Sequence, residues 1–157
     1  MPVKKQRSAK ASILIVEDEV IVAIELREKL RALGWRVSGL ATSGAEAIAA
    51  AEADPPDLVL MDITIKGGMD GFETARRLQA GRRVPVIFIT AFIKKPAPRR
   101  ASPSRPPLFW LSKPLVDEEL VRTIRTALAG ARIEAAPPAL RPRSRRASPE
   151  KARRERD

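Results

Sequence analysis

Short runs of apolar residues recur along the chain and are separated by longer amphipathic stretches. Four runs are unbroken and rich in Ile, Val or Leu, at residues 13–16, 58–61, 84–89 and 108–111. Such runs are typical of strands buried on both faces of a parallel sheet. Residues 35–41 alternate between apolar and polar positions and predict a further strand nearer the sheet edge.

Helical patterns occupy the stretches between these runs. We predict helices over residues 20–33, 44–53, 71–80 and 116–129. The first has one side formed by Val20, Ala23, Ile24, Arg27 and Leu30, with Gly34 as its stop. Ser43 and Glu46 form a capping box for the second, which Pro55 and Pro56 close. In the last helix Gly130 is the expected stop, and one face carries Leu120, Val121, Ile124 and Leu128.

Alternation of strands and helices predicts an α/β domain with right-handed crossovers. The expected fold class is flavodoxin-like, a doubly wound five-stranded parallel sheet in the order 2-1-3-4-5. The length of 157 residues fits one domain of this kind.

Charge divides the chain into a body and basic appendages. Residues 1–11, 94–107 and 131–157 together carry 18 basic and four acidic side chains, whereas the remainder carries 12 basic and 15 acidic ones. We expect residues 1–11 to be a basic tail, residues 12–130 to be the folded domain, and residues 131–157 to be a disordered basic tail. The sharper alternative is that these appendages contact nucleic acid or another anionic partner.

Composition also excludes several kinds of chemistry. The chain has no Cys and no His, so disulfides, thiolate chemistry, imidazole metal sites and a Ser-His-Asp triad are excluded. Its apolar runs are too short for a membrane span or a signal peptide. We therefore expect a soluble cytoplasmic protein.

A polar residue follows each buried run at the end of the strand. Glu17, Asp18 and Glu19 follow the first run, and the next runs lead to Asp62, Thr90 and Lys113. In a parallel sheet these ends share one edge, and ligands bind there where the strand order reverses. Clustered carboxylates without His or Cys suit a hard cation such as Mg²⁺. A carboxylate beside that cation can act as a nucleophile toward phosphorus.

Taken singly, each of these residues has an ordinary structural explanation. The acids at 17–19 could be a first helical turn favoured by the helix dipole, and Asp62 could be a loop residue. Thr90 could be a strand-end hydroxyl, Lys113 a solvated lysine and Trp110 a core residue. The functional hypothesis rests on their joint occurrence, because four matching polar residues stand at four successive strand ends.

These motifs resemble the receiver domain of bacterial two-component response regulators. ILIVEDE, LVLMDITIKGGMDGFE, VIFITAF and WLSKPL each resemble a family motif in order and spacing, over residues 12–130 except 94–107. The resemblance implies that Asp62 is the phosphoacceptor, that Asp18 and Asp62 bind Mg²⁺, and that Glu17 does so through water. It also implies that the Thr64 backbone carbonyl is a ligand of the Mg²⁺.

The resemblance implies further roles. Thr90 and Lys113 would contact the phosphoryl group, the bond from Lys113 to Pro114 would be cis, and Thr90 and Trp110 would form the switch. Thr64 and Phe92 fall at variable positions that tune the phosphoryl-group lifetime in this family.

One segment departs from the family pattern. Residues 94–107 stand where the family has its fourth helix, but they contain five prolines and five basic residues and no acid. Proline removes a backbone donor and clashes with the preceding helical turn, so we expect this helix to be missing or irregular. The alternatives are a loosened loop over an intact site and an altered output surface, which could include a homodimer interface.

The expected function is that of a single-domain response regulator. A sensor histidine kinase would phosphorylate Asp62, and output would pass to a downstream protein or a phosphotransfer protein. The domain would catalyse only its own phosphorylation and dephosphorylation. Two rivals remain: a nucleic-acid-binding protein that acts through the basic tails, and a Mg²⁺-dependent phosphohydrolase. Haloacid-dehalogenase-type phosphohydrolases have a second Asp two residues after the nucleophile, where this chain has Thr64.

Overall fold

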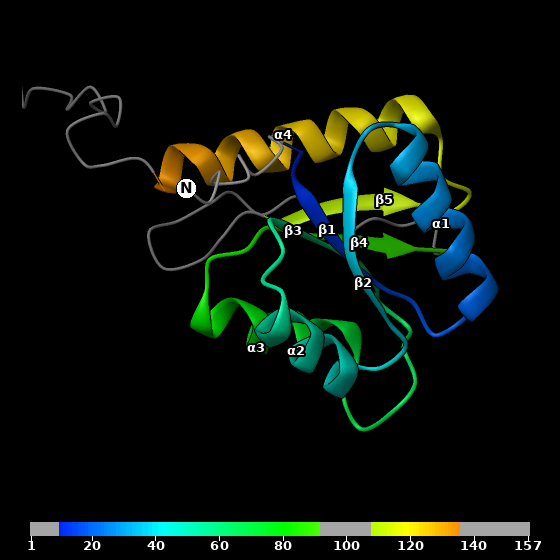
Figure 1. Ribbon diagram of the computed structural model, residues 1–157. Helices are drawn as coiled ribbons and strands as arrows, with labels where there is room; N and C mark the ends of the chain where they lie inside the picture. Colours follow the sequence, from blue (N-terminus) through cyan, green and yellow to red (C-terminus); the bar gives the residue numbers. More distant parts are fainter. Residues whose placement is uncertain (1–9, 92–107, 136–157) are drawn as a thin grey trace, which may run out of the picture.

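Strands and helices alternate through the part of the chain that the computed structural model describes, residues 10–91 and 108–135 (Figure 1). In chain order the elements are β1 (Ser12–Val16), α1 (Val20–Ala32), β2 (Arg36–Ala41), α2 (Gly44–Ala53), β3 (Leu58–Asp62), α3 (Gly71–Gly81), β4 (Val86–Thr90), β5 (Leu108–Ser112) and α4 (Asp117–Ala135).

The five strands form one parallel sheet in the order β2-β1-β3-β4-β5. This confirms the predicted doubly wound fold and places the alternating strand β2 at an edge. Helices α1 and α4 cover one face of the sheet, and α2 and α3 cover the other (Figure 1). The strand order reverses between β1 and β3, so their carboxyl ends bound the crevice in which such folds bind ligands.

Each central strand is buried on both faces, as its unbroken apolar sequence predicts. In β1, Ile13 and Ile15 belong to the core under α1 and α4, whereas Leu14 and Val16 belong to the core under α2 and α3. Successive side chains of a strand point to opposite faces, so a strand between two helical layers needs apolar residues at every position.

Helix α1 buries a different stripe from the one that we predicted. Its buried residues are Ala23, Leu26 and Leu30, whereas Val20 and Ile24 are 55% and 38% exposed. The buried positions follow a spacing of three and four residues, which is the stripe that faces the sheet. The predicted stop is confirmed, because Gly34 follows the helix with φ of 101°.

The capping box of α2 is confirmed in one half only. The Ser43 hydroxyl accepts a hydrogen bond from the backbone N–H of Glu46 at 3.2 Å. The Glu46 carboxylate, however, accepts from the backbone N–H and the hydroxyl of Thr42, both at 2.8 Å, rather than from Ser43. These two bonds lower the pKa of Glu46 and fix the turn between β2 and α2.

Helix α4 is longer than the sequence predicted. It runs through Gly130 to Ala135, so Gly130 is not its stop. Among the described glycines only Gly34 and Gly67 have a positive φ, and Gly130 therefore lacks the left-handed conformation of a helix-ending glycine. The next strong breakers in the sequence are Pro137 and Pro138. The predicted face of α4 is otherwise buried, except that Val121 is only half-buried.

Some predictions fall outside the described residues. They are the irregular segment 94–107, the tail 1–9, most of the tail 131–157, and the position of Phe92. No helix among residues 10–91 and 108–135 is long and apolar enough to cross a membrane.

The glycine at 130 gives a test of the extended helix. Gly130→Ala should raise the free energy of unfolding by about 0.5–1 kcal/mol, because alanine has the higher helix propensity and its Cβ would meet no atom within 4 Å. Gly34→Ala is the matched control and should lower stability, because Gly34 has φ of 101°. Urea unfolding of the full chain measures both, and destabilisation by Gly130→Ala would contradict the helix through that position.

Candidate functional site

The sheet brings the polar residues of four strand ends to one edge. The register pairs Val16 with Met61, Asp62 with Ile89, and Thr90 with Ser112, so the strands end at nearly the same level. Glu17 directly follows β1, Asp62 and Thr90 end their strands, and Lys113 directly follows β5. The predicted site residues therefore come together at this edge.

Lys113 contacts three other residues of the site, which are Glu17, Asp62 and Thr90. Its ammonium Nζ lies 3.1 Å from Glu17 Oε2 and 3.0 Å from Asp62 Oδ2. Its backbone N–H donates to the Thr90 carbonyl at 2.8 Å, which holds the start of the loop against β4. The bond to Pro114 is cis, as expected. Burial opposes the charge on Lys113, but the bonds to Asp62 and Glu17 raise its pKa overall.

The Asp62 side chain is only 7% exposed, and both of its carboxylate oxygens accept hydrogen bonds. Its Oδ1 accepts from the backbone N–H of Thr64 at 3.0 Å and from the Thr64 hydroxyl at 3.2 Å, while Oδ2 accepts from Lys113. Burial would raise the pKa of Asp62, yet the bonds with Glu17, Lys113 and Thr64 lower it overall. Asp62 is therefore held as an anion with little freedom to rotate.

Glu17, Asp18 and Asp62 form a cluster that could hold a metal ion. One carboxylate oxygen from each lies within 4.8 Å of the others. Glu17 is buried and Asp18 is half-buried. Burial, followed by hydrogen bonding and repulsion from Asp62, raises the pKa of Glu17 to about 7. Two neighbouring carboxylates cannot both be charged without cost in a buried place, so a cation is the natural complement of this set.

Two glycines shape the loop that connects the site to α3. Gly71 begins α3 so close to β3 that a Cβ there would lie 2.5 Å from the Asp62 carbonyl oxygen and 2.9 Å from the Cα of Ile63. Gly67 has φ of 109°, which favours glycine. The loop thus closes tightly behind Asp62.

Three aromatic rings form a cluster that the sequence did not reveal. Trp110 lies with its ring centroid 4.9 Å from that of Phe88 and 5.9 Å from that of Phe72. Phe72 stands in the first turn of α3 and is 45% exposed. The Trp110 Nε1 is buried and has no hydrogen-bond partner among residues 10–91 and 108–135. An apolar ring directly after Gly71 was the available signal, because first helical turns usually carry polar residues.

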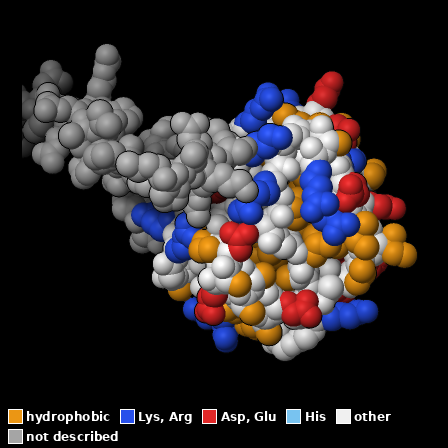
Figure 2. Space-filling view, in the orientation of Figure 1, with side chains coloured by type: hydrophobic (Ala, Val, Ile, Leu, Met, Phe, Trp, Pro, Cys, Tyr) orange, Lys and Arg blue, Asp and Glu red, His pale blue; other side chains and the backbone are white. Residues whose placement is uncertain are grey.

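An apolar rim also flanks the acidic cluster. Val20 and Ile21, which follow Glu19, are 55% and 74% exposed, and Val116 in the loop after Lys113 is 57% exposed. Hydrophobic side chains gather over α1 in the space-filling view (Figure 2). These three side chains stand close in the chain to Asp18 and Lys113, which belong to the strand-end site.

The model of the response regulator receiver domain family matches residues 13–125. The transcriptional regulatory protein PdtaR of Mycobacterium tuberculosis is 33% identical over 117 residues, which cover 74% of this chain and 56% of PdtaR. Protein PilH of Pseudomonas aeruginosa is 32% identical over 123 residues, covering 76% of this chain and 99% of PilH. The chain thus spans about half the length of PdtaR.

Solved structures agree with these matches. The signal receiver domain of a modulated diguanylate cyclase from Desulfovibrio desulfuricans superimposes with a TM-score of 0.67 at 34% identity, covering 80% of this chain and 98% of that one. PhyR from Brucella abortus gives a TM-score of 0.66 at 30% identity, covering 80% and 52%. On this sequence match and this fold, the chain belongs to the response regulator receiver domain family.

Proposed function

We propose that the chain is a phosphoacceptor response regulator that receives a phosphoryl group on Asp62 from a sensor histidine kinase. The observation that carries this proposal is the Asp62 carboxylate itself. It ends the central strand β3, it is kept ionised, and it contacts an ammonium group within a cluster of carboxylates. An anionic oxygen held in one orientation is a competent nucleophile toward phosphorus.

In the reaction, an Asp62 oxygen attacks the phosphorus of a phosphohistidine. An oxygen–phosphorus bond forms, the nitrogen–phosphorus bond breaks, and the imidazole leaves with the electron pair and takes up a proton. Lys113, which now pairs with Asp62 Oδ2, is placed to turn toward the phosphoryl oxygens and offset their charge. Loss of the phosphoryl group to water would return the carboxylate.

The proposed cofactor is Mg²⁺, held by Asp18 and Asp62, by the Thr64 backbone carbonyl, and by Glu17 through water. The oxygen-only donor set and the close approach of the three carboxylates suit this ion. When bound, Mg²⁺ would neutralise charge on the transferring phosphoryl group.

Thr90 and Trp110 are proposed as the switch. Thr90 is buried at the end of β4, and its carbonyl is tied to the backbone of Lys113. Trp110 lies two positions along β5 from Ser112, the partner of Thr90 in the sheet. A shift of Thr90 toward a phosphoryl group would therefore act on the strand that carries the aromatic cluster of Phe72, Phe88 and Trp110.

The kinase is proposed to dock on the apolar rim of Val20, Ile21 and Val116. Val20 and Ile21 directly follow the acids 17–19 and Val116 follows Lys113 closely in the chain, so a partner bound there would hold its phosphohistidine near Asp62. Output would pass to a downstream protein or a phosphotransfer protein.

The hydrolase alternative is weaker. At the position of the second Asp of haloacid-dehalogenase-type enzymes, Thr64 directs both its N–H and its hydroxyl at Asp62. A hydroxyl bonded in this way does not replace the acid–base carboxylate that a phosphohydrolase uses for turnover. Nucleic-acid binding through the basic appendages concerns residues that lie mostly outside the described part of the chain.

Asp62→Asn should abolish phosphorylation by a small phosphodonor such as acetyl phosphate, because the amide is a far weaker nucleophile than the carboxylate. Mass spectrometry of the intact protein measures the added phosphoryl group. Asp57→Asn is a matched control, since Asp57 lies at the opposite end of β3 and bonds Ser12. Undiminished labelling of Asp62→Asn would reject the proposed nucleophile.

Mg²⁺ affinity should rise with pH through about 7, because Glu17 holds a proton below its raised pKa and must lose it for the cluster to become fully anionic. Binding that releases one proton strengthens at most tenfold per pH unit below the pKa of the group and levels off above it. Between pH of about 6 and about 8, Mg²⁺ affinity should therefore rise by roughly tenfold. Glu17→Gln should bind more weakly at pH of about 8 and show a flat profile. Isothermal titration in two buffers of different ionisation enthalpy measures the released proton, and its absence would contradict the assignment.

Ile21→Ser should slow phosphotransfer from a histidine kinase by about tenfold, since it removes an exposed apolar anchor. Labelling by acetyl phosphate should be unchanged, because Ile21 is 74% exposed and supplies no group to the carboxylate cluster. Ile48 is a half-buried apolar residue of α2, so Ile48→Ser controls for a general loss of stability. Equal slowing of both phosphodonors would place the defect in the site and not in docking. The kinase itself is found by screening purified kinases for transfer to the wild-type chain.

A further inference from the structure

A hollow of about 240 Å³ lies between the carboxyl ends of α2 and α3. Its walls include the loops that lead into β3 and β4, at Pro55, Pro56 and Val84. These loops stand at the amino ends of the strands, whereas the acidic cluster stands at the carboxyl ends. The length of the five-residue strand β3, roughly 16 Å, therefore separates the hollow from the phosphoacceptor edge.

Apolar side chains form the inner wall of the hollow. Leu78 and Val84 are 9% and 8% exposed, Pro56 is buried, and Ile48 and Ala51 are half-buried. Sites for small molecules usually have volumes of roughly 300–1,000 Å³, so this hollow is small for a whole cofactor. Its size and lining suit one large apolar side chain of a partner molecule.

Arginines dominate the rim of the hollow. Arg77 and Arg82 line it and are exposed, and Glu52 is the one acid among the lining residues. Arg77 uses its Nε for Glu73, at 3.0 Å. The side chain of Arg82 has no hydrogen bond or ion pair among the residues that the structure describes. A guanidinium in this state is available for a carboxylate from outside the domain.

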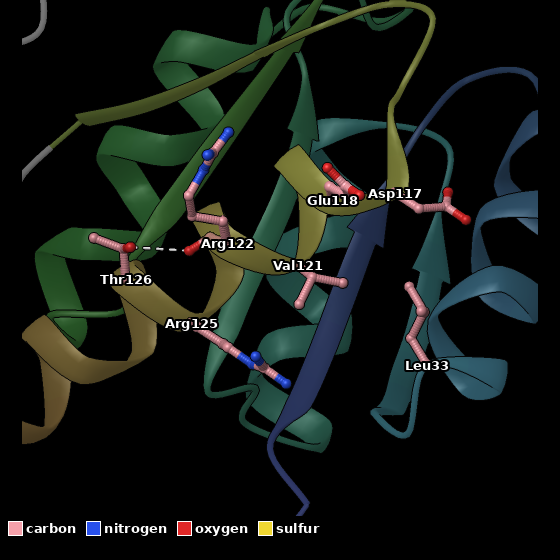
Figure 3. A pocket seen from close by; sticks show the side chains of 7 residues that line it. All are labelled: Leu33, Asp117, Glu118, Val121, Arg122, Arg125 and Thr126. Carbon is pink, nitrogen blue, oxygen red and sulfur yellow. Dashed lines mark hydrogen bonds between the residues drawn. The ribbon is translucent and has the colours of Figure 1, made fainter.

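The groove along α4, on the other face of the sheet, has a different distribution of charge. Figure 3 shows Asp117 and Glu118 toward one end of that groove and Arg125 toward the other. Two acids and two arginines balance there, whereas the hollow of α2 and α3 has an excess of positive charge. The appendages of the chain are themselves strongly basic and do not match this rim. An acidic occupant therefore has to come from another molecule.

We propose that this hollow docks a partner protein through a segment in which one large apolar side chain is flanked by acidic residues. The apolar side chain would fill the space against Leu78 and Val84, and the acids would pair with Arg82 and Arg77. A buried anchor of this kind supplies most of the binding energy, and the surrounding charges set specificity. Because the hollow and Asp62 lie at opposite ends of β3, the partner can stay bound while a kinase reaches the carboxylate.

Three fluorescent peptides test the proposal on the full chain. The first has a central Phe flanked by Glu, the second has Ser in place of Phe, and the third has Lys in place of Glu. The first should bind about tenfold or more tightly than either of the others, because it alone offers both the anchor and the charge. The second peptide controls for attraction of acids to the basic appendages.

NMR amide shifts locate the bound peptide. With the first peptide, the shifts should change at Ala51, Gly81 and Val84, which line or adjoin the hollow, and stay constant at Thr64 and Lys113 in the phosphoacceptor site. Equal binding of the first two peptides would overturn the proposal, as would shifts that map outside the hollow. Binding of single-stranded DNA to the same arginines more tightly than the first peptide would make the surface a nucleic-acid site and would equally overturn it.

Variants with opposite expected effects complete the test. Arg82→Glu should weaken binding of the first peptide by about tenfold, and Glu52→Gln should strengthen it by about threefold, because the first replaces an attractive charge and the second removes a repulsive one. Arg125→Glu is the matched control, since Arg125 is exposed and lies outside the hollow, and it should bind as the wild type does. Circular dichroism checks that each variant folds, and an unchanged affinity of folded Arg82→Glu would contradict the proposal.

The docking proposal and the phosphoacceptor proposal are tested separately. Asp62→Asn should bind the first peptide as the wild type does, and Arg82→Glu should be labelled by acetyl phosphate as the wild type is. Both expectations follow from the separation of the hollow and the carboxylate by the length of β3. Loss of labelling in Asp62→Asn therefore carries no information on the hollow, and loss of peptide binding in Arg82→Glu carries none on the nucleophile.

Discussion

The ion pair of Lys113 with Glu17 and Asp62 is the interaction on which the arrangement of the site depends. It ties the end of β5 to the ends of β1 and β3, and it is largely excluded from solvent on the carboxylate side. Without a cation there, two buried carboxylates would repel each other across a short distance. Burial and the neighbouring Asp62 raise the pKa of Glu17 despite its bond to Lys113, and one lysine cannot fully neutralise three acids, so the cluster suits Mg²⁺.

The two faces of the sheet serve different purposes around this edge. The side of α2 and α3 closes tightly behind Asp62, since Gly71 allows α3 to begin against the backbone of β3. The same side carries Phe72 against Phe88 and Trp110, so the loop behind Asp62 and strand β5 are linked by aromatic contact. The side of α1 and α4 instead presents exposed apolar and charged side chains, which are suited to binding other proteins.

Membership of the receiver family explains why these features occur together. As the proposed phosphoacceptor, Asp62 needs a rigid position, a counter-charge and a route by which its modification is felt elsewhere. The parallel sheet gives the first by ending β3 at Asp62, and Lys113 gives the second. The third is proposed to run through Thr90 and the aromatic cluster, because both β4 and β5 border the site.

The sequence by itself determined the sheet, its order and the residues that meet at its edge. Strands buried on both faces leave an unbroken apolar signature, and each polar site residue stands directly where such a run ends, as Asp62 and Thr90 show. Tertiary structure decided which side of α1 is buried, how far α4 continues past Gly130, and that Phe72 meets Trp110. These features depend on packing between segments far apart in the chain, where local propensity has little weight. The raised pKa of Glu17 likewise arises from burial beside Asp62, a neighbour that only folding supplies.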